Sequence, residues 1–372
     1  MDRCDILVRG DGAVGAAAAL ALSRAGFDVA LLGAPPAPDG TPAAEDLRAY
    51  ALNEASVALL RALKVWDAIP GEARTPVHDM RIEGDLPGAH LEFSAWSEAV
   101  AQLAWIVDAA LLERTLREAL RFAPHVRRVA AELPAALTVL AEGKASSTRA
   151  RLGVRMERHP YGHCAIAARL VCDRPHAGLA RQWFRSPDVL ALLPIDRPLA
   201  GHGLALVWSL PDERAQALLA LDAAAFEAEL MAATEGAAGT LELAGARAGW
   251  PLAIGHAEPV CGPGWVLLGD AAHVVHPLAG QGLNLGFGDV VSLVEVLEQR
   301  EPWRALGDER LLARHARRRA GPVRAMGLVT DGLLHLFASE QPLVKELRNR
   351  GLDLVNRLPP LKHLFARQAA GL

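Results

Sequence analysis

Residues 5–36, "DILVRGDGAVGAAAALALSRAGFDVALLGAPP", contain the pattern that most limits the fold of this chain. The short apolar run Asp5–Val8 is typical of a buried strand, and Ala16–Arg24 has the small residues of a tightly packed helix that ends at Gly26. Glycines in the spacing GxGxxG lie between the two. A strand, a glycine turn, a helix and a second strand predict a βαβ unit, and therefore a parallel sheet covered by helices.

The glycine turn has the spacing that suits a dinucleotide. A pyrophosphate can bind at the N-terminus of the helix, where backbone N–H groups and the helix dipole favour negative charge. The first glycine permits the tight turn, the second lets the backbone approach the phosphates, and the third lets helix and strand pack closely. The residues expected to contact the ligand are Gly10, Gly12, Ala13, Val14 and Gly15. A turn that binds nothing is the alternative.

Composition excludes several functions. The chain has 372 residues and a net charge of −4, so it can bury a large core but lacks the basic charge that nucleic-acid binding requires. Its four cysteines have no CxxC spacing and no neighbouring histidine pattern, which favours a reduced, intracellular protein without a metal site. No apolar run approaches the roughly 18 residues of a spanning helix. We therefore expect a cytoplasmic protein, or one bound to a membrane only at its surface.

Further elements follow from periodicity. Leucines at helical spacing predict a helix that includes Leu52, Leu59, Leu60 and Leu63, and Asp108 is expected to cap a helix over 108–122. Residues 71–100 and several stretches between 163 and 210 alternate as strands do. Residues 265–298 predict a buried strand, an irregular Gly/Pro loop and an amphipathic helix. The basic run at 314–324 is expected to be a solvated helix face.

Several stretches together resemble the ubiquinone-biosynthesis hydroxylases, a family of FAD-dependent aromatic monooxygenases within the group A flavoprotein hydroxylases. Besides the glycine turn, they are "EDLRAYALNEASVALLRAL", "AEGKASSTR", "YGHCAIAARLVCDRPHAGLARQWFRSPDVLALLPI" and "GDAAHVVHPLAGQGLNLGFGDV". The first is similar to the family's D-x-R-x-x-A-L segment and the second to its A-D-G-x-x-S-x-x-R motif. The last two are long and particular to the family, and the resemblance covers nearly the whole chain.

The resemblance implies an α/β fold in which a doubly wound, Rossmann-like FAD-binding domain is interleaved with a mainly antiparallel β-sheet substrate domain and followed by a C-terminal helical tail. We expect the FAD-binding domain at 1–70, 101–158 and 251–325. The substrate domain is expected at 71–100 and 159–250, and the tail at 326–372.

The resemblance also implies the reaction. An aromatic ring, most plausibly that of a prenylated phenol on the way to ubiquinone, is hydroxylated with FAD as cofactor and NAD(P)H and O2 as co-substrates. The chain has one glycine-rich dinucleotide motif, so the nicotinamide is expected to bind transiently. The cofactor supplies the difficult chemistry, and the protein positions the ring and excludes water.

Two segments are expected to hold the flavin. Asp270 follows the strand "WVLLGD", at the edge of an α/β sheet where ligands bind, and its carboxylate can accept hydrogen bonds from the ribitol hydroxyls. The loop after it has little side-chain bulk, and the following helix directs its positive dipole end toward the flavin ring. The expected cofactor contacts beyond the glycine turn are Arg48, Asp270, Pro277, Gly280, Gln281, Gly282, Leu283 and Asn284.

Other polar residues leave alternatives open. His273 and His276 titrate in the range needed for acid–base work on a phenol, although a histidine in a Gly/Pro loop is more often a hydrogen-bonding strut. Arg149, at the end of "ASSTR", is either a cation near the cofactor or a surface arginine.

Three departures from the family pattern favour a different class of function. Gly33 stands where a dinucleotide site usually has an acid that binds the adenosine ribose, Glu142 replaces the aspartate of A-D-G, and residues 123–140 form a shorter stretch than the family usually has. They raise the alternative of a catalytically weakened homologue that is a structural subunit of a quinone-biosynthesis assembly. A nicotinamide-dependent dehydrogenase is a second alternative, which "GDAAHVVHP" argues against. Asp39, Glu45 or Asp46 is expected to replace the missing acid if any residue does.

The tail combines leucines at near-helical spacing with six basic and three acidic side chains over residues 339–368. That composition suits either packing on the protein's own core or peripheral contact with an anionic inner membrane, where a prenylated substrate resides.

Overall fold

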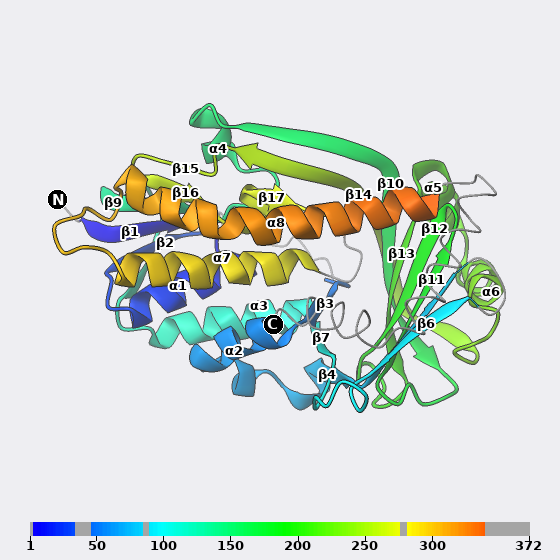
Figure 1. The fold of residues 1–372 in the computed structure, drawn as a ribbon. Coiled ribbons are helices and arrows are strands. Elements are labelled where there is room, and N and C mark those ends of the chain that lie inside the picture. The colour runs from blue at the N-terminus through cyan, green and yellow to red at the C-terminus, as the bar shows by residue number, and fades with distance from the viewer. Residues whose placement is uncertain (1–2, 34–45, 85–88, 276–280, 339–372) are drawn as a thin grey trace.

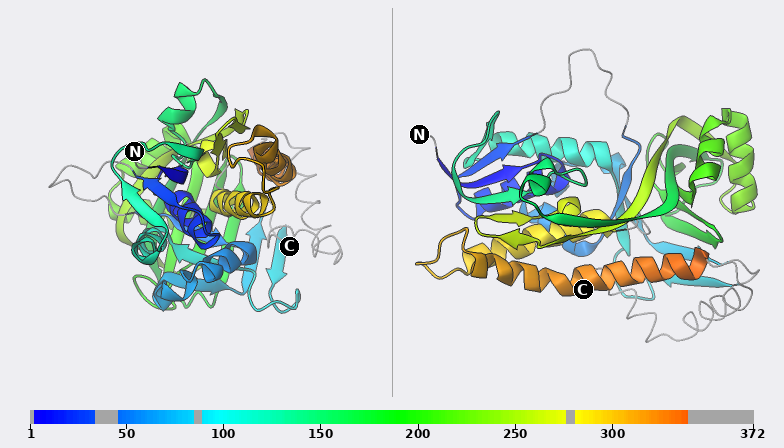
Figure 2. Two further views of the ribbon diagram at one scale, coloured as in Figure 1. Left: turned by 90° about the vertical axis from the view of Figure 1, so that its left-hand side faces the viewer. Right: turned by 90° about the horizontal axis from the view of Figure 1, so that it is seen from above.

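The computed structural model describes residues 3–33, 46–84, 89–275 and 281–338. The molecule is elongated, with one sheet and its helices at one end and a second large sheet at the other (Figures 1 and 2). No helix in these four ranges is long and apolar enough to cross a membrane.

The first sheet contains the predicted βαβ unit. Its strand order is β15-β16-β9-β1-β2-β8, and all neighbours pair in parallel except β15 with β16. The strands are β1 (Cys4–Arg9), β2 (Val29–Leu32), β8 (Val126–Val129), β9 (Ala135–Leu140), β15 (Cys261–Gly262) and β16 (Trp265–Leu267). This sheet, with helices packed against it, confirms the predicted Rossmann-like architecture.

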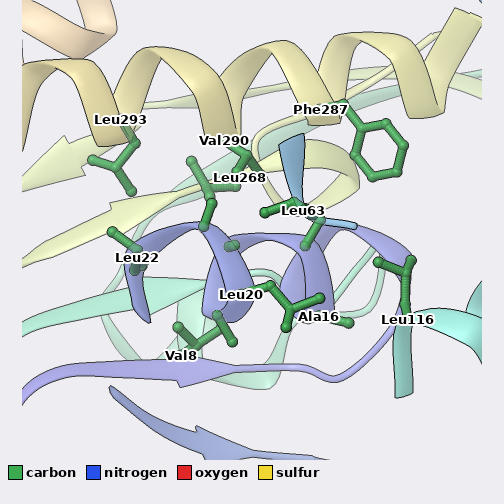
Figure 3. Packing of buried hydrophobic residues seen from close by; sticks show 14 of the residues in the cluster. Val8, Ala16, Leu20, Leu22, Leu63, Leu116, Leu268, Phe287, Val290 and Leu293 are labelled. Atoms are coloured by element: carbon green, nitrogen blue, oxygen red, sulfur yellow. The ribbon is translucent and has the colours of Figure 1, made fainter. Parts of the chain in front are cut away.

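Helix α1 (Ala13–Arg24) joins β1 to β2 and is buried along most of its length. Its alanines allow close approach on both sides, to the sheet and to α7 (Gln281–Glu298). Figure 3 shows α1 between β1 and α7, with Leu20 and Leu22 in the same cluster as Val290 and Leu293. The amphipathic pattern predicted for 283–297 therefore faces α1 and the sheet.

The second sheet is mainly antiparallel, as predicted. Its order is β17-β14-β10-β13-β12-β11-β5-β6, and among the pairings described only β11 with β5 is parallel. The strands are β5 (Asp79–Glu83), β6 (His90–Ser94), β10 (Arg155–Cys172), β11 (Leu179–Arg185), β12 (Asp188–Pro194), β13 (Gly203–Pro211), β14 (Leu241–Glu258) and β17 (His273–Val274). Helices α5 (Asp212–Ala220) and α6 (Ala223–Thr234) pack on it around Trp208 and Phe226.

A small three-stranded sheet, β3-β7-β4, lies between the two larger ones (Figure 1). Its strands are β3 (Ala49–Leu52), β4 (Arg74–Val77) and β7 (Ala104–Asp108). Helix α2 (Glu54–Ala62) follows β3, and α3 (Ala109–Ala119) follows β7. The prediction that Leu52 belongs to the helix was wrong, because Leu52 ends β3 and Asn53 caps α2 by accepting the Ser56 N–H at 2.9 Å. The Asp108 carboxylate caps α3 as predicted, because it accepts the N–H of Leu111 at 3.0 Å. Its other oxygen accepts from buried Arg169 of β10 at 2.9 Å, which ties the small sheet to the large antiparallel one.

The two large sheets are joined by continuous elements rather than by linkers. The boundaries expected after residues 158, 250 and 325 fall inside β10, β14 and α8 (Glu309–Ala338). Figure 2 shows β10 and β14 extending from one sheet region to the other, with α8 lying along both. The domain division therefore stays a prediction, and the part of the expected tail beyond residue 338 lies outside the described residues.

Candidate cofactor site

The three glycines of the turn have distinct physical roles. Gly10 has a φ of +100°, and a Cβ on it would overlap the carbonyl oxygen of Ala141. A Cβ on Gly15 would overlap the carbonyl oxygen of Gly10. Gly12, by contrast, has no described atom within 4 Å of its Cβ position. Two glycines are therefore required by the protein's own packing, and the middle one leaves the backbone open.

This open turn fits a phosphate group. Gly12 is the N-cap of α1, and no side chain in the described part of the chain caps the helix there. The first turn of α1 also contains no acidic residue, so its N–H groups and dipole favour an anion. Ala13 is buried, and Val14 packs against the Cβ positions of Gly269 and Gly286. Both residues lie in the first turn of α1, where their backbone N–H groups have no partner within the helix.

The Asp270 segment meets α1 at this point. After β16 the chain forms a 3-10 turn, η4 (Gly269–Ala271), in which Gly269 has a φ of +57°. Asp270 is half-buried, and its Oδ1 lies 3.9 Å from the Cβ position of Gly282 in the first turn of α7. The carboxylate thus stands beside the start of α7, at the carboxyl end of a parallel strand as predicted. His276, Pro277 and Gly280 lie outside the described residues.

A buried aspartate that the sequence analysis missed holds this turn. Asp289 of α7 accepts the Gly269 N–H at 2.9 Å, and its Oδ2 lies 2.7 Å from Nε2 of His273. Arg319 of α8 donates to the other oxygen at 2.7 Å. Burial by itself raises the pKa of Asp289, but the charges of His273 and Arg319 outweigh it and hold the pKa well below its usual range. Asp289 is therefore an anion that positions the turn bearing Asp270.

His273 has the buried partner expected of the hydrogen-bonding strut, which the sequence analysis gave as the alternative to an acid–base group. It is 5% exposed, and the Asp289 charge raises its pKa against the opposing effect of burial. The basic run 314–324 is likewise not a solvated face throughout, because Arg319 binds Asp289 and His315 is buried. Burial lowers the pKa of His315 to about 4. A single aspartate inside the apolar pattern of 283–297 was the available signal for this cluster.

Arg149 supports the same turn from the other side. It is buried and not a surface arginine, and it donates to the Ala271 carbonyl at 2.8 Å and to the Lys144 carbonyl at 3.0 Å. Arg149 lies in the short helix α4 (Ser147–Arg151). Glu142 anchors that helix by accepting from Ser146 Oγ at 2.6 Å and from Thr148 Oγ1 at 2.8 Å. Glu142 therefore has a structural role, which its side chain performs although it is longer than the aspartate of the A-D-G motif.

Asn284 and Leu283 face the protein interior. The Asn284 amide donates to the Ala51 carbonyl at 2.8 Å, and its oxygen accepts from Ser56 Oγ at 2.7 Å. Leu283 belongs to the core, and the Gln281 side chain accepts from Asn284 at 3.1 Å. Contacts with a cofactor from Asn284 and Leu283 would have to come from their backbones, and these contacts stay predictions.

Arg48 directly precedes β3 and belongs to a charged group. It donates to Asp46 at 2.7 Å, lies 3.4 Å from the Glu113 carboxylate, and stacks over the Tyr50 ring at 5.7 Å. Burial raises the pKa of both Glu113 and Tyr50. The negative charge of Asp11 adds to the rise in the pKa of Glu113, and the negative charge of Asp270 adds to the rise in the pKa of Tyr50. Arg48 therefore lies in a group of side chains that extends from the glycine turn toward Asp270.

Comparison with known proteins agrees with this geometry. A family described as an FAD binding domain matches residues 121–327, more than half of the chain. The ubiquinone hydroxylase UbiL of Rhodospirillum rubrum is 31% identical over 396 residues, covering 99% of this chain and 89% of that protein. The chain belongs to the FAD-dependent ubiquinone hydroxylase family. The 3-demethoxyubiquinol 3-hydroxylase of Escherichia coli is also 31% identical, covering 99% of this chain and 98% of that protein.

Solved structures of this fold include other members of the wider class. PqsL, a probable FAD-dependent monooxygenase from Pseudomonas aeruginosa, superposes with a TM-score of 0.75 at 21% identity, covering 95% of this chain and 100% of that one. The p-nitrophenol 4-monooxygenase PnpA of Pseudomonas putida gives 0.77 at 16% identity, covering 100% of this chain and 99% of that one. At identities this low, the similarity shows only that these proteins share a fold with the present chain. Family membership makes the present chain an FAD-dependent hydroxylase.

Proposed function

We propose that this hydroxylase acts on the aromatic ring of a prenylated phenol in ubiquinone biosynthesis, with NAD(P)H and O2 as co-substrates. The observation that carries the proposal is the joining of the two cofactor segments, the glycine turn and the Asp270 turn, in a chain similar over 99% of its length to two ubiquinone-pathway hydroxylases. Bound FAD supplies the reduction by nicotinamide and the activation of oxygen.

The protein's own residues hold and orient the cofactor in this proposal. Backbone N–H groups of the Gly12 turn bind the pyrophosphate, and the Asp270 carboxylate accepts from the ribitol chain. The N-terminus of α7 lies at the end of that helix nearer the eight-stranded sheet (Figure 1), where its dipole stabilises negative charge on the flavin ring. His273, Asp289 and Arg149 keep the turn in place and do not exchange protons with substrate.

The rival proposal, a structural subunit without activity, loses its support. Glu142 anchors α4 and also accepts from Arg9 Nε at 2.9 Å, and residues 123–140 provide both β8 and β9 of the parallel sheet.

Asp270→Ala is expected to abolish both flavin retention and turnover, because no other carboxylate is proposed to bind the ribitol hydroxyls. Protein purified with excess FAD is assayed for bound flavin by absorbance. NAD(P)H oxidation is followed with a panel of prenylated phenols, and the products are identified by mass spectrometry. Glu213→Ala, at an exposed position on α5, is the matched control and is expected to match the unmodified protein. If the panel leaves oxidation at its blank rate in FAD-saturated unmodified protein, the hydroxylase proposal is wrong.

We also propose that residues 339–368, which lie outside the described ranges, contact an anionic membrane surface. Their leucine spacing and the excess of six basic over three acidic side chains support peripheral binding. The full chain is expected to float with liposomes containing phosphatidylglycerol and to remain unbound with neutral liposomes. Equal recovery of the full chain and of a chain ending at Ser339 would refute a membrane role for this segment. We also propose that the protein belongs to a quinone-biosynthesis complex.

A further inference from the structure

The end of β2 contains an aspartate that does not belong to that strand. A Cβ added at Gly33 would lie 2.6 Å from Oδ2 and 2.8 Å from Cγ of Asp11. Asp11 is the residue between the first two glycines of the turn, and its carboxylate occupies the space in which any side chain at position 33 would begin. Gly33 has no positive φ, so its backbone does not require glycine. A side chain at position 33 would instead displace the Asp11 carboxylate, which is the far end of a flexible side chain.

We infer that Asp11 replaces the missing acid and accepts hydrogen bonds from the adenosine ribose hydroxyls of FAD. In a dinucleotide site the ribose-binding carboxylate stands at the end of the second strand, beside the glycine turn. Asp11 places a carboxylate at that position from the turn itself. The inference rests on the family's FAD binding and does not depend on the proposed aromatic substrate.

The electrostatic surroundings suit a carboxylate that binds hydroxyls. Asp11 is half-buried and directly precedes the N-cap of α1, whose positive dipole end stabilises its charge. Burial is the main cause that raises the pKa of Glu113, and the negative charge of Asp11 adds to it against the opposing charge of Arg48. Among the earlier candidates, Asp46 is held by two hydrogen bonds from the Arg48 guanidinium, at 2.7 and 2.8 Å. Asp39 and Glu45 lie outside the described residues.

This geometry predicts that an acid introduced at position 33 weakens FAD binding as long as Asp11 is present. Gly33→Glu in the unmodified protein forces the Asp11 carboxylate out of its place and brings two negative charges together, so FAD affinity is expected to fall. In Asp11→Ala the same substitution meets no carboxylate and restores an acid at the strand end. The combination Asp11→Ala/Gly33→Glu is therefore expected to bind FAD more tightly than Asp11→Ala alone.

The test is a titration of apoprotein by quenching of flavin fluorescence, with FAD and FMN in parallel. Asp11→Ala is expected to weaken FAD binding about tenfold to a hundredfold, the loss expected for hydrogen bonds to a charged group. FMN binding is expected to be unchanged, because FMN has no adenosine. Competition with ADP and 2′-deoxy-ADP isolates the ribose. The unmodified protein is expected to prefer ADP, and Asp11→Ala to lose that preference.

Several outcomes would overturn the inference. An FAD affinity of Asp11→Ala within twofold of the unmodified protein excludes Asp11, as does an equal loss for FAD and FMN. A loss of the ADP preference in Asp46→Ala but not in Asp11→Ala assigns the ribose to Asp46. Because these titrations contain no aromatic substrate, failure of the proposed hydroxylation leaves their results unaffected.

Discussion

Asp289→Ala is expected to lower the free energy of unfolding by about 3–5 kcal/mol, the cost of removing one partner from a buried ion pair. The substitution leaves the Gly269 N–H without its acceptor and leaves the buried His273 and the Arg319 guanidinium without their anion. Because Gly269 begins the turn that carries Asp270, the variant is also expected to purify without flavin.

Urea unfolding of the FAD-free proteins measures the first effect. Glu295→Ala is the matched control, since Glu295 lies on the same helix but is half-exposed, 3.5 Å from Arg318. An exposed pair of this kind contributes less than about 1 kcal/mol. Asp289→Asn keeps the size of the side chain and removes its charge. Its loss of unfolding free energy is expected to lie between those of Asp289→Ala and Glu295→Ala. If Asp289→Ala unfolds at the same urea concentration as Glu295→Ala, the buried cluster does not stabilise the fold.

The difference in unfolding free energy between the unmodified protein and Asp289→Asn is expected to depend on pH. The pKa of His273 is raised in the folded protein, so its pairing adds stability that is fully present below its unfolded pKa of about 6.5. That stability is lost as the pH rises through the folded value. In Asp289→Asn the histidine has no anion and is expected to stay neutral. The stability difference between the unmodified protein and Asp289→Asn is therefore expected to be larger at about pH 5.5 than at about pH 8.5.

Gly12→Ala and Gly15→Ala are expected to separate cofactor binding from folding. Gly12 has φ of −67° and ψ of −179°, which any residue adopts, and no described atom lies within 4 Å of its Cβ position. Alanine there is expected to lower the free energy of unfolding by only about 0.5–1 kcal/mol, because alanine is a poorer N-cap residue than glycine. Its methyl group nevertheless stands where a phosphate approaches the backbone, and FAD binding is expected to weaken about tenfold to a hundredfold.

Gly15→Ala is expected to damage the fold itself. Its Cβ overlaps the Gly10 carbonyl oxygen and lies 3.3 Å from the Ala141 Cβ, so α1 must move away from β1 and β9. Overpacking of this kind costs about 1–3 kcal/mol, and FAD binding is lost with it. Gly71→Ala, at an exposed position with no described atom within 4 Å, is expected to change neither quantity. Equal stability losses in Gly12→Ala and Gly15→Ala would contradict the separate roles of the two glycines.

Local patterns predicted much of the cofactor site. The glycine spacing and the small residues of Ala16–Arg24 specify a tight turn and a closely packed helix within one stretch of chain, and α1 forms there. Asp108 caps α3 because the capping contact joins residues three apart. Asp270 follows a buried strand, so its place at the carboxyl edge of the sheet depended only on that strand being parallel.

The role of a polar side chain was harder to predict than the element it lies on. His273 lies within the segment that carries Asp270, and Arg149 was left as either a cation near the cofactor or a surface arginine, but the roles of both depend on partners supplied by other elements. Arg149 meets a carbonyl 122 residues away, and His273 meets Asp289 on the next helix. No periodicity or spacing rule links such positions, because their contact exists only after α4, α7 and η4 have packed together.

The sequence by itself determined the βαβ unit, the glycine turn and the helices whose apolar faces repeat at a regular spacing, because these depend on neighbours along the chain. The tertiary structure alone decided which charges became partners. It brought Arg319 of α8 to Asp289 of α7, made the basic run a partly buried face, and placed Asp11 beside Gly33. The physical reason is that burial makes an unpaired charge costly, and only the packed arrangement of helices and sheet specifies which charges are buried and which partner lies within reach.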